Sequence, residues 1–209
     1  MEEYLNEKEQ WERVLAWLRE QGPWILAGVA VALAVYGGWN YWQNRTQQRN
    51  LAAAVRYQQV IDAFEHNDLN GGSRLADELI KAYPTTAYAD QANLAVARIQ
   101  IENKQLEPAA ARLRQVLAST SDPELALVVR LRLARVELAQ GNADQALKTL
   151  DAVKPGAFAA RYAQVRGDVL LAKGDRDGAL KAYREARSTG GTTTDAGLLD
   201  LKIGELARS

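Results

Sequence analysis

Residue types that carry catalytic or metal-binding chemistry are scarce in this sequence. It contains one histidine, His66, and no cysteine among its 209 residues. A Cys/His metal cluster and a thiol nucleophile therefore cannot form, and one histidine leaves little for a Ser/His pair. The GxSxG, Walker and GxGxxG patterns, which position a nucleophile or a phosphate, are also missing. We therefore predict a protein that is not an enzyme and has no cofactor or small-molecule substrate.

One segment has part of the chemistry of a calcium site. In GDRDG, Asp175 and Asp177 are two residues apart and a glycine follows. A calcium loop of about twelve residues also needs later acidic ligands, and Tyr183, Arg184 and Glu185 follow in their place. The alternative is a turn in which Asp175 caps the next helix, and we favour it because the related segment GNADQ has the same turn without the acids.

The elements that must position any functional side chain are predicted to be helices. Ala, Leu, Arg, Gln, Glu and Lys dominate beyond residue 43, which favours an all-α fold. Proline and glycine interrupt these stretches at intervals. The segments GNADQALKTLDAV, from Gly141, and GDRDGALKAYREA, from Gly174, match at an offset of 33 residues. We expect two helices in each repeated unit.

Small residues recur where the two helices of a unit would cross. A step of 37 residues back from Ala146 reaches Ala109, and a further step of 33 reaches Ala76. The same step of 33 from Ala97 reaches Phe64, where a small residue is expected. The predicted crossing residues are Ala76, Ala97, Ala109, Ala134, Ala146, Gly167 and Ala179. A period near 34 resembles the tetratricopeptide repeat, so we predict an α-solenoid of helical hairpins. A capping helix would follow, with Thr194 or Asp195 as its N-cap.

Stacked hairpins of this kind form a concave face that the first helix of each unit lines. The candidate groove residues are Arg98, Ile101, Arg135, Leu138, Asp168 and Leu171. The alternative is that the arginines are ordinary solvated charges on amphipathic helices. The segment that follows residue 43 has 23 basic and 20 acidic residues, without the basic stripe of a nucleic-acid surface. Protein clients are therefore the expected ligands.

An uncharged run extends from Gln21 to Asn44. A helix of about 20 apolar residues crosses a hydrocarbon core about 30 Å thick. The predicted membrane-anchor residues are the aromatic Trp24, Trp39 and Trp42 and the small-residue face Ala30, Ala34 and Gly38. The sequence thus predicts a short N-terminal segment over residues 1–21, a single transmembrane helix over 22–43 and a repeat domain over 44–209.

The alternatives to this anchor are a cleavable signal peptide and a buried core helix. A signal peptide has a basic leader, whereas residues 1–20 contain six glutamates and three basic residues. A core helix seldom runs this long without a polar face. Three Lys or Arg residues lie near each end of the run, so the positive-inside rule leaves the orientation open.

The order of these parts resembles the YfgM family of Gram-negative bacteria, the tetratricopeptide-like ancillary subunits of the SecYEG translocon. The strongest matching segments are Leu131 to Phe158 and RGDVLLAKGD, and WLREQG, GWNYW and QQRNLAAAVRYQQV support them. The resemblance implies an inner-membrane protein with a cytoplasmic N-terminus and a periplasmic repeat domain. It also implies association with the SecYEG translocon and with PpiD, a membrane-anchored periplasmic chaperone, in the handover of emerging secretory proteins. A structural scaffold of another envelope complex, without contact to unfolded clients, is the alternative function.

Overall fold

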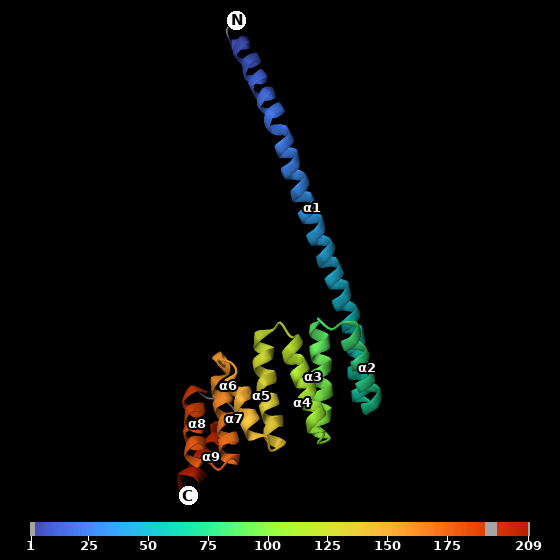
Figure 1. Cartoon of the computed structure of the whole chain (residues 1–209). Coiled ribbons are helices and arrows are strands. Elements are labelled where there is room, and N and C mark those ends of the chain that lie inside the picture. The colour runs from blue at the N-terminus through green and yellow to red at the C-terminus, as the bar shows by residue number, and fades with distance from the viewer. Residues whose placement is uncertain (1–2, 191–195, 209) are drawn as a thin grey trace. The chain divides into compact units, whose positions relative to one another are not determined.

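The computed structural model describes residues 3–190 and 196–208, and every regular element in these residues is helical (Figure 1). The elements are α1 (Glu3–Glu65), α2 (Leu69–Ala82), α3 (Ala87–Glu102), α4 (Leu106–Ser119), α5 (Pro123–Ala139), α6 (Ala143–Asp151), the 3-10 helix η1 (Gly156–Phe158), α7 (Ala159–Ala172), α8 (Arg176–Thr189) and α9 (Ala196–Arg208). The chain forms two compact units, Met1–Arg49 and Asn50–Ser209. The prediction of an all-helical chain is confirmed for the described residues.

The first unit contains the part of α1 up to Arg49, and many large apolar side chains of this part are exposed. Trp24 is 77% exposed, and Trp39 and Trp42 are each 60% exposed. The rings of Trp39 and Trp42 lie 5.8 Å apart between centroids. Among the predicted anchor residues, Ala30, Ala34 and Gly38 are exposed as well.

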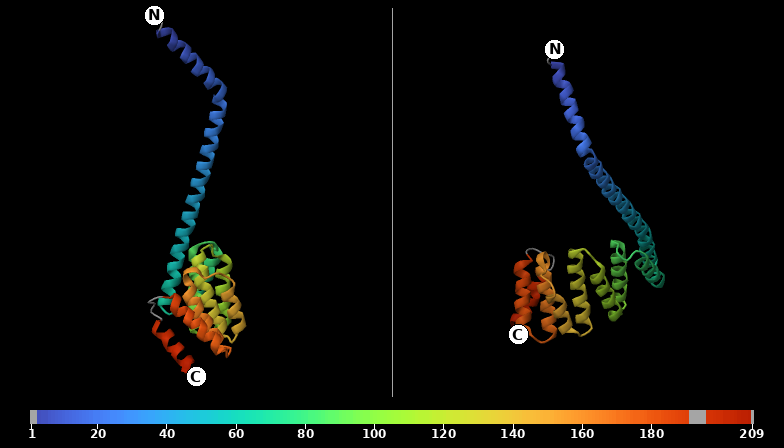
Figure 2. Two further views of the ribbon diagram at one scale, coloured as in Figure 1. Left: turned by 90° about the vertical axis from the view of Figure 1, so that its left-hand side faces the viewer. Right: turned by 45° about the horizontal axis from the view of Figure 1, so that its top comes forward.

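The helix α1 is bent within its apolar part. Among the described residues, no single helix has the length and hydropathy of a membrane span, and one bent pair of segments, Trp11–Gly22 and Leu26–Glu65, meets both requirements only together. The two segments meet at 51° (Figure 2). Pro23 lies between them and has no amide proton for the helical hydrogen bond. The predicted single transmembrane helix over residues 22–43 is therefore not confirmed.

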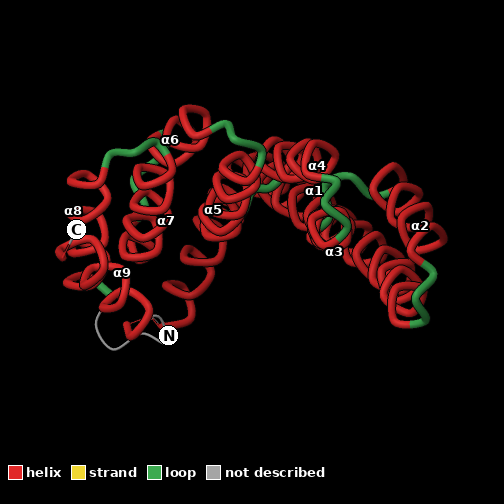
Figure 3. Tube along the Cα trace, turned by 90° about the horizontal axis from the view of Figure 1, so that it is seen from below, coloured by secondary structure: helices red, strands yellow, loops and turns green. Residues whose placement is uncertain are grey.

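The second unit is a solenoid of helical hairpins. The end of α1 shares a core with α2 and α3, and the pairs α3 with α4, α5 with α6, and α7 with α8 follow along the chain. Helix α9 packs on α8. In Figure 3, α3, α5 and α7 follow the inner edge of an arc, while α4 and α6 follow its outer edge. The inner edge corresponds to the first helix of each hairpin.

Four clusters of buried apolar side chains hold the described part of the solenoid together, each shared between neighbouring helices. The predicted crossing residues lie in this interior. The alanines are at most 1% exposed and the glycine is buried: Ala76, Ala97, Ala109, Ala134, Ala146, Gly167 and Ala179. The predicted N-cap of the last helix, Thr194 or Asp195, lies outside the described residues.

The same turn joins the two helices of all four hairpins. One residue in each turn has a left-handed φ: Asn67 (60°), Lys104 (60°), Gly141 (81°) and Gly174 (83°). The amide of the next residue then donates to the carbonyl oxygen five positions back, for example Asp68 to Ala63 and Asp175 to Leu170, both at 2.9 Å. Equivalent positions in successive hairpins are therefore 37, 37 and 33 residues apart.

This shared turn corrects the predicted register of the first hairpin. Counted from the turns, Gly72 and not Ala76 takes the position of Ala109. The ring of Phe64 covers Gly72, where an added Cβ would lie 2.5 Å from the Phe64 Cδ1 atom. A shift of four residues is close to one helical turn, so it leaves the apolar pattern almost unchanged. The pattern alone therefore could not distinguish the two registers.

The last hairpin contains a second close contact between a glycine and an aromatic ring. An added Cβ on Gly167 would lie 2.5 Å from the Cε1 atom of Tyr183. Tyr183 is 0% exposed, and its hydroxyl donates to the Asp168 carboxylate at 2.8 Å. In the preceding hairpin the equivalent pair is Ala134 and Leu150. Gly167 thus provides the space for the larger Tyr183 ring.

The phenol of Tyr183 predicts a loss of stability at alkaline pH. Burial, and then the hydrogen bond and charge of Asp168, raise the pKa of Tyr183 well above its usual value. The unfolded chain releases this proton near pH 10, whereas the folded chain retains it, so the free energy of unfolding falls as the pH rises above about 10. We expect urea unfolding midpoints to fall less between pH 9 and 11 in Tyr183→Phe than in the unmodified chain. Tyr36→Phe, in the first unit, is the control and should retain the full decrease; an equal decrease in Tyr183→Phe would contradict the prediction.

Candidate functional site

A pocket of 550 Å³ lies on the inner edge of the solenoid, and we call it the inner pocket. All its walls come from first helices of hairpins, namely the end of α1, α3 and α5. Its lining residues are Tyr57, Ile61, Phe64, Glu65, Gln91, Leu94, Ala95, Arg98, Ile99 and Arg132. Its volume is within the range of pockets that take up drug-sized ligands or a few side chains of a peptide.

The inner pocket combines apolar walls with a charged margin. Tyr57, Phe64 and Leu94 are partly buried against the solenoid cores. Burial raises the pKa of Tyr57, and its phenol can act as a hydrogen-bond donor. At the margin, the 78%-exposed side chain of Arg98 pairs with Glu102 at 2.8 Å, and Arg132 is exposed. Such a surface suits an apolar segment that has polar or acidic neighbours.

The turn register shows that two rows of equivalent side chains run across the first helices. One row, which we call the charged row, consists of Ile61, Arg98, Arg135 and Asp168. The other, which we call the apolar row, consists of Phe64, Ile101, Leu138 and Leu171. Both rows begin in the inner pocket, because Ile61 and Phe64 line it.

The structure places the six predicted groove residues in different surroundings. Arg98 lines the inner pocket, and Arg135 is exposed on α5. In the apolar row, Ile101 is 36% and Leu171 is 37% exposed. Leu138 is partly buried against the core that α5, α6 and α7 share.

Asp168, the last of the six, is engaged by other residues of the solenoid. Its carboxylate accepts hydrogen bonds from the Tyr183 hydroxyl and from the Lys202 ammonium group of α9. Its side chain is 27% exposed. The two donors occupy Asp168 at the α9 end of its row, so the accessible charged side chains of that row are Arg98 on α3 and Arg135 on α5.

The sequence reasoning missed the members of both rows that lie on α1. Ile61 and Phe64 were not identified as groove residues because the first hairpin was predicted one helical turn out of register. The signal that could have found them is the pair Asn67 and Asp68, which combines two residue types that favour turns and helix caps. Asp68 in fact accepts a hydrogen bond from the Gly71 amide at 2.8 Å, like Asp175 from Gly178 at 2.9 Å.

The residues with possible catalytic or calcium-binding chemistry have structural contacts. Asp175 is the N-cap of α8, which confirms the capping turn. The Nδ1 atom of the exposed His66 lies 2.7 Å from the backbone carbonyl oxygen of Asp62. Within the described residues, no group of three or more His, Cys, Asp or Glu side chains is arranged to hold a metal ion.

Comparison with known proteins agrees with this architecture. The family model described as a tetratricopeptide repeat-like domain matches residues 15–208. The chain is 36% identical over 207 residues to the ancillary SecYEG translocon subunit of Escherichia coli K12, covering 99% of this chain and 100% of that protein. It is 33% identical to the protein of the same name from Aggregatibacter actinomycetemcomitans, covering 90% of this chain and 91% of the relative. Among solved structures, the crystal structure of MamA has a TM-score of 0.57 at 17% identity over 70% of this chain and 81% of MamA, which shows a shared fold.

Proposed function

Because this chain belongs to the family of ancillary SecYEG translocon subunits, whose members it matches over nearly its full length, we propose that it is a membrane-anchored adaptor that binds proteins at the translocon. The observation that carries the proposal is the inner pocket, where the apolar row and the charged row begin on one accessible face. The adaptor would act by binding and not by catalysis. Its ligands would be apolar segments of secretory proteins and of partner proteins.

The membrane anchor in this proposal is the uncharged segment over residues 22–43. Its aromatic and aliphatic side chains are exposed in the first unit, as expected of a surface that contacts lipid. Residues 1–21 would be cytoplasmic, and the repeat domain over 44–209 would be periplasmic. Anchoring raises the effective concentration of the repeat domain near the translocon, so a weak binding surface is sufficient.

The proposed partners are the SecYEG translocon and a PpiD-like periplasmic chaperone. A secretory chain emerges unfolded and exposes apolar segments, which match the apolar row Phe64, Ile101, Leu138 and Leu171. The small-residue face Ala30, Ala34 and Gly38 would allow close packing against a membrane helix of a partner. The apolar row would retain the client, and the small-residue face would position the adaptor beside its membrane partner.

Site-specific photocrosslinking in cells tests this proposal. A photoreactive amino acid is placed at Arg98 or Arg135 on the inner edge, at Ala34 in the anchor, and at the exposed Lys148 of α6 as a control. We expect adducts with nascent secretory chains from Arg98 and Arg135, adducts with translocon or chaperone membrane helices from Ala34, and few adducts from Lys148. Capture of folded envelope subunits alone would favour the scaffold alternative. Equal capture of clients from Lys148 and Arg98 would contradict the assignment of the inner edge.

A further inference from the structure

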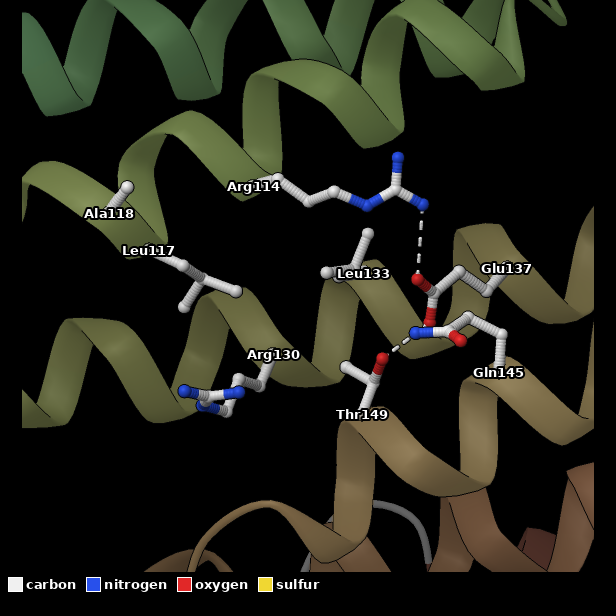
Figure 4. A pocket seen from close by; sticks show the side chains of 8 residues that line it. All are labelled: Arg114, Leu117, Ala118, Arg130, Leu133, Glu137, Gln145 and Thr149. Atoms are coloured by element: carbon white, nitrogen blue, oxygen red, sulfur yellow. Dashed lines mark hydrogen bonds and ion pairs between the residues drawn. The ribbon is translucent and has the colours of Figure 1, made fainter.

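A second pocket, of 350 Å³, opens where α4, α5 and α6 meet, and we call it the outer pocket (Figure 4). Its lining residues are Arg114, Leu117, Ala118, Arg130, Leu133, Glu137, Gln145 and Thr149. Two of its three helices, α4 and α6, follow the outer edge of the arc (Figure 3). None of these eight residues lines the inner pocket.

The single carboxylate of the outer pocket is fully engaged. Glu137 is 0% exposed; it accepts a hydrogen bond from the Thr149 hydroxyl at 2.7 Å and one from the Arg114 guanidinium at 3.2 Å. Arg114 also lies 3.7 Å from a carboxylate oxygen of Glu107. The charge of Arg114 is therefore already balanced within the protein.

The second guanidinium of the outer pocket has no such acceptor. Arg130 is partly buried, and in the described part of the chain it forms no ion pair or hydrogen bond. Figure 4 shows its side chain on the Leu117 side of the pocket, away from Glu137. A partly buried guanidinium with unused N–H groups is a strong site for a carboxylate, because the planar group can donate two parallel hydrogen bonds.

The position of Arg114 has an acid in two of the other hairpins. The turn register makes Asp77 on α2, Arg114 on α4, Asp151 on α6 and Arg184 on α8 equivalent positions. Asp77 pairs with Arg112 at 2.5 Å, and Asp151 pairs with Arg166. On α4 this position has a base, and the lining of the outer pocket therefore has two arginines and one glutamate.

We infer that the outer pocket binds an acidic segment of a protein partner, with a carboxylate on Arg130 and a neighbouring aliphatic side chain against Leu117 and Leu133. The partner would supply an acid to a pocket whose lining has two arginines and one glutamate. The apolar wall favours a peptide over a free small anion, because an isolated carboxylate would leave Leu117 and Ala118 uncovered. This site is separate from the inner pocket and does not depend on what the inner pocket binds.

Binding of a defined peptide to the full chain in detergent micelles tests the inference. The probe is a fluorescein-labelled peptide containing Leu-Asp-Leu-Glu, and its control contains Leu-Asn-Leu-Gln. By fluorescence anisotropy, we expect the acidic peptide to bind about tenfold more tightly than its amide control, since charge-assisted hydrogen bonds are about twice as strong as neutral ones. Arg130→Gln should weaken binding of the acidic peptide about tenfold, and Arg130→Lys should weaken it less because it keeps the charge.

Arg161→Gln is the matched control. Arg161 lies on α7, has the same charge, is exposed, and lines neither the inner nor the outer pocket. Its substitution should change the affinity less than about twofold, with only the general effect of one surface charge. A photoreactive residue at Ala118 should form an adduct with the acidic peptide, and Arg130→Gln should suppress it. Equal binding of acidic and amide peptides, equal effects of the two substitutions, or no saturable binding up to about 1 mM would each overturn the inference. Helical circular dichroism of each variant separates loss of binding from loss of folding.

Discussion

Substitution of Glu137 by alanine is expected to reduce the free energy of unfolding by about 3 kcal/mol. The side chain is 0% exposed, so its removal leaves a cavity and removes the acceptor of the buried Thr149 hydroxyl. Arg114 contributes less to this loss, because its side chain is 46% exposed and can be rehydrated or move toward Glu107. Urea unfolding of the full chain in detergent, followed by far-ultraviolet circular dichroism, measures the change.

The next hairpin provides a control for the Glu137 prediction. Leu170 and Ala182 stand at the positions of Glu137 and Thr149, so the double variant Glu137→Leu with Thr149→Ala reproduces an apolar pair already used in this fold. We expect this variant to lie within about 1 kcal/mol of the unmodified chain, because an apolar replacement of a buried charged group is often neutral. If the double variant is as unstable as Glu137→Ala, the loss comes from the missing ion pair and not from the unsatisfied polar groups and the cavity.

Substitution of Gly167 by alanine is expected to reduce the free energy of unfolding by about 2 kcal/mol, the balance of overpacking and a helix-propensity gain of about 1 kcal/mol. The new methyl group would lie 2.5 Å from the Tyr183 ring. That ring is fully buried, and its hydroxyl is bound to Asp168, so it cannot move aside easily. The shift in the urea unfolding midpoint tests this expectation.

Two further variants separate crowding from the intrinsic effect of a glycine substitution. Gly204→Ala in α9 has only Arg208 within 4 Å of the new Cβ, so it should leave the stability unchanged or increase it. The double variant Gly167→Ala with Tyr183→Leu reproduces the Ala134 and Leu150 pair of the preceding hairpin and should recover most of the loss. Failure of the second substitution to recover stability would contradict the steric explanation.

The last two helical hairpins could be predicted from sequence because their turns contain glycine. Gly141 and Gly174 have left-handed φ values that favour glycine, and their spacing fixed the register of the last two hairpins. The first hairpin has Asn67 in that role, and a shift of one helical turn preserved its apolar pattern. Periodicity therefore predicts which residues share a face more reliably than it predicts where a hairpin begins.

The two pockets could be predicted only in part, since each brings together segments that are distant in sequence. Arg98 was predicted from its position on a first helix, whereas Tyr57 and Leu94 line the inner pocket only because α1 and α3 are neighbours in the solenoid. The outer pocket brings together Arg114 of α4, Arg130 of α5 and Thr149 of α6, which are distant in sequence. The sequence shows the arginines but does not show which of them have acceptors.

The division of the solenoid interior into four clusters has a mechanical consequence. Each cluster joins only neighbouring helices, so a load along the chain is resisted by one interface at a time. Force applied to the C-terminus would first detach α9, which contributes Leu199 to the last cluster, and would then open the hairpins in sequence. The repeat domain would extend in steps under tension, and each step would leave the clusters nearer the N-terminus intact.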